Sequence, residues 1–168
     1  MMHATRTTLV LLVLLALLAG TAAQAAAPRP FVAGSMQQIR AAYAGRPFVL
    51  ALWSLTCSHC QEELAQLGTL QRRHPELNVV LISTDTPDDA AALTATLAGH
   101  GLARAEAWVY ADGFAERLRF EIDPRWCGEL PRTYFFDRAH AVTARSGALA
   151  PVELERWAIA PLAPKATP

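Results

Sequence analysis

The sequence contains three cysteines, and two of them, Cys57 and Cys60, are separated only by Ser58 and His59. Two intervening residues let both sulfurs lie on one side of a single helical turn, where a disulfide can form and open with little backbone movement. At the start of a helix, free backbone N–H groups and the helix dipole stabilise the thiolate of the first cysteine, which is the reactive form. The pair predicts thiol–disulfide exchange, in which Cys57 forms a mixed disulfide with a substrate and Cys60 resolves it.

His59 is a further candidate catalytic residue because it lies between the two cysteines. A histidine beside a thiolate can stabilise it, which favours the reduced form and makes the disulfide a better oxidant. The same residue could instead be a solvated side chain on the first turn of the helix. The direction of electron flow therefore stays open.

Metal binding is the main other use of these cysteines. A zinc site requires four ligands, and the sequence has no second Cys-x-x-Cys and no pair of closely spaced histidines to complete one. Copper suits thiolates and His59, although Met36 is the only methionine after residue 25. We therefore predict no cofactor and no metal, and keep a copper-binding assembly factor as the alternative function.

A thiol peroxidase is a weaker alternative. Ser54 places a hydroxyl three residues before Cys57, as in the peroxiredoxin motif. The upstream proline of that motif is missing, because Leu50 stands in its place.

The elements that must position the cysteines are a strand and a helix that meet at Cys57. Residues 48–53 form a continuous apolar run, which is typical of a strand buried on both faces. From Ser58 onward, leucines recur with a period near 3.6, which predicts an amphipathic helix. Cys57 should therefore lie at the N-terminus of that helix.

The rest of the chain alternates between helical and strand patterns. Helices are predicted over residues 36–43, 87–98, 113–120 and 151–161, and strands over residues 78–83, 108–110, 133–137 and 142–145. This order predicts an α/β fold with a mixed central sheet flanked by helices, with the last two strands as a hairpin.

The first residues predict export. Arg6 precedes an apolar run over residues 9–19, and Ala23-Gln24-Ala25 follows it, the order of a secretory signal peptide cleaved after Ala25. The run is about half of the roughly 20 residues that a membrane-spanning helix needs, so an uncleaved anchor is less expected. A lipid anchor would need a cysteine where Thr21 stands. We expect a periplasmic or otherwise exported protein that is soluble after cleavage.

Size and charge set the domain organisation. We assign residues 1–25 to the signal peptide, 26–35 to a linker, 36–163 to one domain and 164–168 to a tail. Fifteen basic and fifteen acidic residues balance, and no arginine stripe follows a phosphate backbone, so nucleic acid is not an expected partner. We expect a monomer.

Four stretches of the chain resemble exported thioredoxin-like proteins of the TlpA/ResA type, over most of residues 31–160. They are Pro47-Phe48-Val49-Leu50-Ala51-Leu52-Trp53, Cys57-Ser58-His59-Cys60-Gln61-Glu62-Glu63-Leu64, Leu130-Pro131-Arg132-Thr133-Tyr134-Phe135-Phe136-Asp137 and Gly147-Ala148-Leu149-Ala150-Pro151-Val152-Glu153-Leu154. The resemblance implies a thioredoxin-like three-layer fold and thiol–disulfide oxidoreductase activity on exported protein thiols. It also implies a membrane-embedded electron donor or acceptor and a setting such as cytochrome c or metalloprotein maturation.

Two further site residues follow from this resemblance. Pro131 would be the cis-proline that faces the cysteines from the loop before a strand. Glu63 would be the active-site glutamate that assists proton movement, since it lies one helical turn beyond Cys60. Without the resemblance, Glu63 could as well be a surface acid, and an ordinary trans proline is the lesser alternative for Pro131.

The sequence also departs from the family pattern. Thr56 stands where the family usually has tryptophan, Ser58 replaces a common proline, and Ala51 occupies the position of the buried aspartate of cytosolic thioredoxins. The redox potential therefore cannot be carried over. The loop of residues 124–129 enlarges the segment before Pro131 and contains Cys127, whose thiol could exchange with the pair or be buried and inert.

Overall fold

The computed structural model describes residues 26–162 of the 168-residue chain. The predicted signal peptide, its cleavage site and the tail lie outside the described residues. The strands are β1 (Arg29–Phe31), β2 (Phe48–Trp53), β3 (Val79–Ser83), β4 (Glu106–Tyr110), β5 (Arg132–Phe136) and β6 (Val142–Ser146). The helices are α2 (Ser35–Ala42), α3 (Ser58–Arg73), α4 (Ala90–Gly99), α5 (Ala115–Ile122) and α6 (Pro151–Ile159), with short 3-10 turns at Pro87–Asp89 and Ala160–Leu162.

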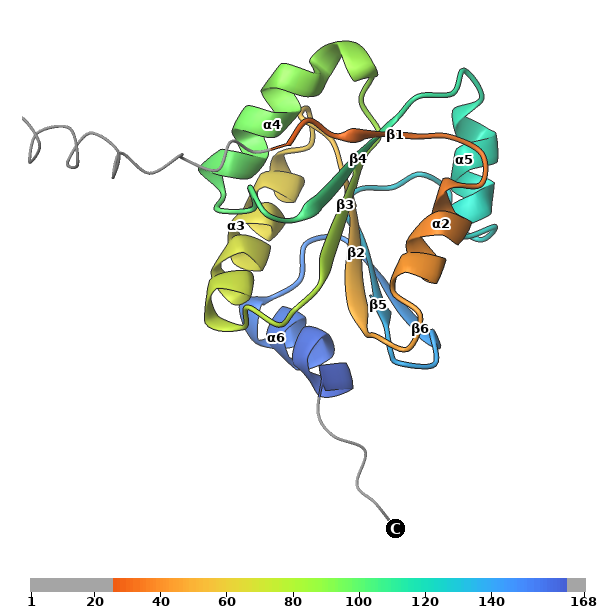
Figure 1. The fold of residues 1–168 in the computed structure, drawn as a ribbon. Helices are drawn as coiled ribbons and strands as arrows, with labels where there is room; N and C mark the ends of the chain where they lie inside the picture. Colours follow the sequence, from red (N-terminus) through yellow and green to blue (C-terminus); the bar gives the residue numbers. More distant parts are fainter. Residues whose placement is uncertain (1–25, 163–168) are drawn as a thin grey trace, which may run out of the picture.

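The six strands form one sheet in the order β1-β4-β3-β2-β5-β6. Strands β1 to β4 run parallel, whereas β5 is antiparallel to β2 and β6 to β5. Helices α3, α4 and α6 cover one face of the sheet, and α2 and α5 cover the other (Figure 1). The predicted three-layer α/β fold with a mixed sheet and a terminal hairpin is confirmed.

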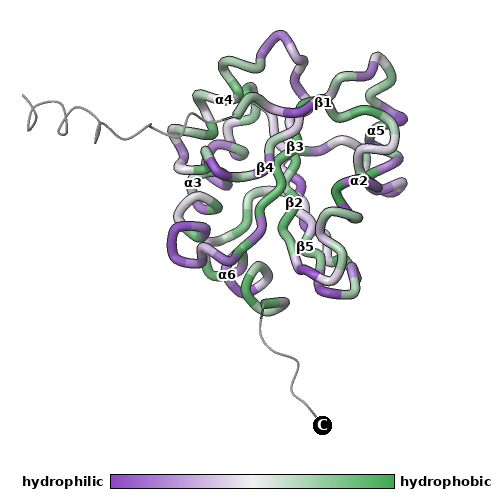
Figure 2. The backbone as a smooth tube through the Cα atoms, viewed as in Figure 1, coloured by the Kyte–Doolittle hydropathy of each residue, from purple (hydrophilic) through white to green (hydrophobic). Residues whose placement is uncertain are grey.

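Strand β2 is buried on both faces, which explains its unbroken apolar sequence. Side chains alternate along a strand, so Val49, Ala51 and Trp53 enter the core under α3, while Phe48, Leu50 and Leu52 enter the core under α2. Figure 2 shows this hydrophobic centre, with hydrophilic segments towards the periphery. No helix within residues 26–162 combines the length and apolarity needed to cross a bilayer.

The linker predicted over residues 26–35 is wrong at its centre, because Arg29–Phe31 forms strand β1 and pairs with β4. Phe31 is fully buried against the rings of Trp108 and Tyr110. Pro30 obscured the strand in the sequence, since proline is excluded from central strands and β1 is an edge strand. A segment of three residues is also too short to show an alternating pattern. Pairing with β4 therefore defines this strand.

Helices α3 and α4 approach closely at Gly68, where a Cβ atom would lie 1.9 Å from the backbone oxygen of His100. Gly68→Ala should therefore lower the free energy of unfolding by about 1–3 kcal/mol, the usual effect of overpacking. Gly99→Ala is a matched control, because Gly99 is also helical and a Cβ there meets nothing within 4 Å. Urea unfolding should show that only Gly68→Ala destabilises the protein, and equal midpoints for the two variants would contradict the close approach.

Candidate active site at the start of helix α3

Cys57 and Cys60 form a disulfide at the junction between β2 and α3, with their Cα atoms 5.2 Å apart. Cys57 is the N-cap residue of α3, and its sulfur accepts a hydrogen bond from the backbone N–H of Cys60 at 3.2 Å. The predicted placement of Cys57 at a helix N-terminus is confirmed. The free N–H groups of the first turn and the helix dipole therefore act on the Cys57 sulfur.

The two sulfurs differ in exposure. Cys60 is 0% exposed and belongs to the core beneath α3, whereas Cys57 is only partly buried. A protein substrate can therefore approach Cys57 but cannot reach Cys60 directly. This asymmetry fits an exchange reaction in which Cys57 meets the substrate and Cys60 acts afterwards.

Glu63 lies one turn beyond Cys60 and is buried, with 2% of its surface exposed. The surface-acid alternative is therefore wrong. Burial raises the pKa of the Glu63 carboxyl, while the hydroxyl of Thr133 and the backbone N–H of Leu149 partly offset this effect. The Thr133 hydroxyl donates to Oε1, and Oε2 is buried without a hydrogen-bond partner. Glu63 can therefore hold a proton inside the protein beside the buried cysteine.

Pro131 lies at the same end of the sheet as the cysteines. The Leu130–Pro131 peptide bond is cis, as the family resemblance implies, and Pro131 is buried immediately before β5. Strand β5 is antiparallel to β2, and its first residue, Arg132, pairs with Leu52 near the end of β2. The cis-proline loop and the loop that carries Cys57 thus lie at the same end of the sheet.

Ion pairs fasten the loop before Pro131 at both ends, a feature that the sequence analysis missed. Asp123 accepts hydrogen bonds from the side chains of Arg125 at 3.2 Å and Arg132 at 3.1 Å. Although partial burial opposes it, the hydrogen bonds from Arg125 and Arg132 hold the pKa of Asp123 below its ordinary value. Trp126 is buried in the core under α2 and donates its indole N–H to the Glu129 carbonyl.

His59 and Cys127 are both exposed. Within residues 26–162, the His59 side chain makes no hydrogen bond or ion pair, so its geometry matches a solvated residue on the first turn. The buried alternative for Cys127 is wrong, because its thiol is free and exposed, with its sulfur 3.9 Å from the Arg125 carbonyl. No cluster of three or more His, Cys, Asp or Glu side chains is placed to hold a metal ion in the part of the chain that the structure describes.

Asp85 is another polar residue at this end of the sheet that the sequence analysis missed. It follows β3, whose last residue, Ser83, pairs with Trp53 at the end of β2. Its carboxylate accepts the backbone N–H of Leu55 and the hydroxyl of Ser54. The hydroxyl that a thiol peroxidase would direct at Cys57 is therefore directed at Asp85. A polar residue just after a strand parallel to β2 was the signal that could have identified it.

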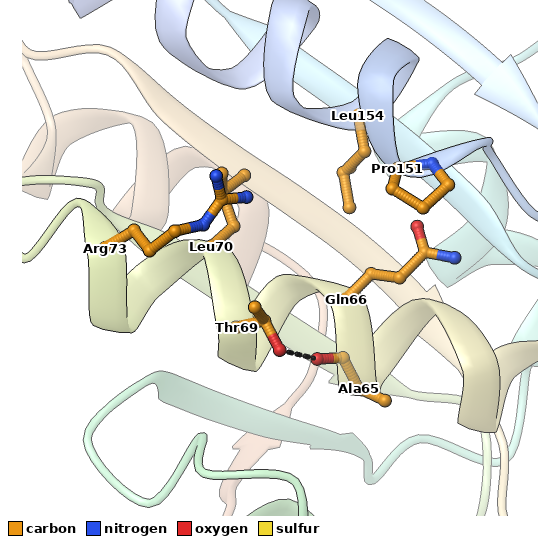
Figure 3. Close-up of a pocket in the computed structure, with 7 residues that line it drawn as sticks. All are labelled: Ala65, Gln66, Thr69, Leu70, Arg73, Pro151 and Leu154. Carbon is orange, nitrogen blue, oxygen red and sulfur yellow. Dashed lines mark hydrogen bonds between the residues drawn. The ribbon is translucent and has the colours of Figure 1, made fainter.

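A hollow of about 260 Å³ lies between α3 and α6 (Figure 3). It is lined by Ala65, Gln66, Thr69, Leu70, Arg73, Pro151 and Leu154. The Thr69 hydroxyl is already bonded to the Ala65 carbonyl within the helix. None of the candidate catalytic residues borders this hollow.

The described chain is similar to solved structures of disulfide-exchange proteins. A secreted Mycobacterium tuberculosis disulfide oxidoreductase, homologous to E. coli DsbE, matches with a TM-score of 0.60 and 23% identity over 71% of this chain and 85% of that one. M. tuberculosis DsbF matches with a TM-score of 0.59 and 22% identity over 71% and 84%.

A thioredoxin-family thiol:disulfide interchange protein from Chlorobium tepidum matches with a TM-score of 0.58 and 16% identity over 74% of this chain and 85% of that one. No protein-family model and no curated protein sequence matches the chain. At these identities the likeness concerns the architecture. The chain has a thioredoxin-like fold with a Cys-x-x-Cys disulfide at the start of the helix that follows β2.

Proposed function

We propose that the chain is a thiol–disulfide oxidoreductase that exchanges electrons with protein thiols through Cys57 and Cys60. The observation that carries this proposal is the disulfide at the start of α3, with one accessible and one buried sulfur. In the reducing direction, the Cys57 thiolate attacks a client disulfide and displaces one client thiolate. Cys60 then attacks the Cys57 sulfur, which releases the second client thiol and restores the disulfide. The oxidising direction is the reverse.

Buried Glu63 supplies the proton chemistry in this proposal. Cys60 must lose a proton before it can attack, and it lies in an apolar core that water does not reach. A carboxylate one turn away can accept that proton and return it in the reverse reaction. His59 is proposed to stabilise the Cys57 thiolate from the solvent side.

The cellular setting is also part of the proposal. The predicted signal peptide and the secreted M. tuberculosis neighbour support action on exported protein thiols, in the periplasm or outside the cell. A membrane-embedded partner would then supply or remove electrons, and cytochrome c or metalloprotein maturation is the proposed pathway class. We propose that the protein acts as a monomer.

The test is a redox titration of the purified protein in glutathione buffers, combined with turnover of insulin disulfides in the presence of dithiothreitol. We expect the Cys57–Cys60 disulfide to open and close reversibly and to accelerate insulin reduction. A reduction potential of about −270 mV would indicate a reductant, and one of about −120 mV would indicate an oxidant. If the disulfide neither exchanged with glutathione nor accelerated insulin reduction by dithiothreitol, the proposal would be contradicted. Tight binding of one copper(I), lost when either cysteine is replaced, would then support the copper alternative.

A further inference from the structure

The loop between β2 and Cys57 is held by a single carboxylate on the neighbouring strand end. Asp85 Oδ1 accepts the hydroxyl of Ser54 at 2.8 Å. Asp85 Oδ2 accepts the backbone N–H of Leu55 at 2.9 Å and the hydroxyl of Ser83 at 2.6 Å. The loop that leads into the reactive cysteine is therefore bonded to the end of β3 at both oxygens.

These bonds determine where the hydroxyl protons point. A carboxylate only accepts hydrogen bonds, so Ser54 uses its one proton on Asp85. The oxygens of Ser54 and Thr56 are 3.1 Å apart, and in this contact Thr56 must therefore be the donor. The backbone N–H of Thr56 also points to the Ser54 oxygen, at 3.2 Å. Both donors of Thr56, the residue before Cys57, are thus used on Ser54.

We infer that Asp85 is a positioning residue that keeps the Cys57–Cys60 pair reducing, because it orients the hydroxyl protons of Ser54 and Thr56 away from the Cys57 sulfur. A hydroxyl donated to the thiolate would stabilise the reduced state and make the disulfide a stronger oxidant. The negative charge of Asp85 near the start of α3 acts in the same direction, against the helix dipole. The inference rests on the proposed function and assigns it a direction, reduction of client disulfides.

The other charged groups around the cysteines are separate from this network. Glu63 is bonded to Thr133 on the Cys60 side, and Arg132 is paired with Asp123 and Glu129. His59 is exposed to solvent. None of these groups bonds to Asp85, Ser54 or Thr56, so the network can be altered without disturbing them.

Asp85→Asn is the decisive variant because it fits the same space. Its amide oxygen can still accept from Leu55 and Ser83 in the place of Oδ2, while its amide N–H₂ faces Ser54. The Ser54 hydroxyl then donates to Thr56, and the Thr56 proton becomes free to be donated to another acceptor, such as the Cys57 thiolate. Ser54→Ala should also free the Thr56 hydroxyl proton, because it removes the oxygen that accepts it. It leaves the bonds of Asp85 to Leu55 and Ser83 intact.

The measurement is the equilibrium with glutathione, in which two glutathione thiols reduce the Cys57–Cys60 disulfide to two thiols and become glutathione disulfide. We expect Asp85→Asn and Ser54→Ala to raise the equilibrium constant for reduction about three- to tenfold, the effect of one hydrogen bond. Alkylation of Cys57 by iodoacetamide at pH 6 should accelerate in parallel. Asp88→Asn removes a charge from an exposed residue of the following turn and is the control that should change neither value.

A double-mutant cycle with Thr56→Val tests whether the Thr56 hydroxyl carries the effect of Asp85→Asn. If the hydroxyls carry the effect, Asp85→Asn should lose more than half of it in the Thr56→Val background. An unchanged equilibrium constant in both single variants, or an Asp85→Asn effect that persists undiminished without the Thr56 hydroxyl, would overturn the inference. Failure of the proposed function looks different, since the unaltered protein itself would not exchange with glutathione. Circular dichroism monitors folding, and Ser54→Ala serves as the test if Asp85→Asn does not fold.

Discussion

Cys60→Ala should stop the exchange reaction after its first step and trap a mixed disulfide between Cys57 and the client. Cys57 is accessible at the start of α3, so it should still attack, whereas Cys60, its disulfide partner that would resolve the product, is missing. Turnover of insulin disulfides should fall by at least about 10³-fold, as expected when one member of a two-residue catalytic unit is removed. Non-reducing electrophoresis and mass spectrometry of the conjugate would identify Cys57 as the attachment site.

Cys57→Ala and Cys127→Ser complete this experiment. Without Cys57, the fully buried Cys60 cannot meet a protein substrate, so neither turnover nor a mixed disulfide is expected. Cys127 is exposed but lies in a separate loop, and Cys127→Ser should retain full turnover. Conjugation through Cys127 in the Cys60→Ala variant, or substantial turnover by Cys57→Ala, would contradict the assigned roles.

Local sequence patterns predicted the part of the site that depends on neighbouring residues in the chain. The apolar run of β2 and the 3.6-residue period of α3 place Cys57 at a helix N-terminus without any knowledge of the rest of the fold. The family resemblance added Pro131, whose cis bond has no local sequence signature beyond the proline itself.

The parts that could not be predicted depend on contacts between distant segments. Glu63 occupies a helical position that allows either burial or exposure, and only the packing of Thr133 and Leu149 against it decides between them. Asp85 contacts Ser54 because β3 lies beside β2, a pairing that no local pattern specifies. Strand β1 likewise depends on its pairing with β4, which is distant in the sequence.

Glu63→Gln should slow the resolution step at neutral pH, because glutamine preserves the size of the side chain and can still accept from Thr133 but cannot take up a proton. General-base catalysis contributes about 10²–10⁴-fold, so a loss of about 10²-fold in the Cys60-dependent step is expected. Stopped-flow measurement of the return of the Cys57–Cys60 disulfide separates this step from the first attack. Glu62→Gln alters the exposed neighbour on the same helix and should leave both steps unchanged.

Glu63→Gln should slow exchange but increase the stability of the folded protein. Burial raises the pKa of Glu63 in the folded protein above its ordinary value of 4.5, so the folded state binds the proton more tightly than the unfolded state. The stabilisation from this protonated carboxyl is complete below pH 4.5 and is lost as the pH rises through the raised pKa. Glu63→Gln stays neutral throughout, so its advantage should grow from pH 4 to pH 8.

Thermal unfolding of the oxidised proteins measures this difference. At pH 8 the Tm of Glu63→Gln should exceed that of the unaltered protein, and each 1 kcal/mol of added stability would raise it by about 2–4 °C in a domain of about 150 residues. At pH 4 the two values should converge, because both side chains are then neutral. A slower but more stable variant would show that the protein retains a buried carboxyl at a cost in stability because exchange requires it. Equal rates together with equal Tm values at both pH values would remove Glu63 from the mechanism.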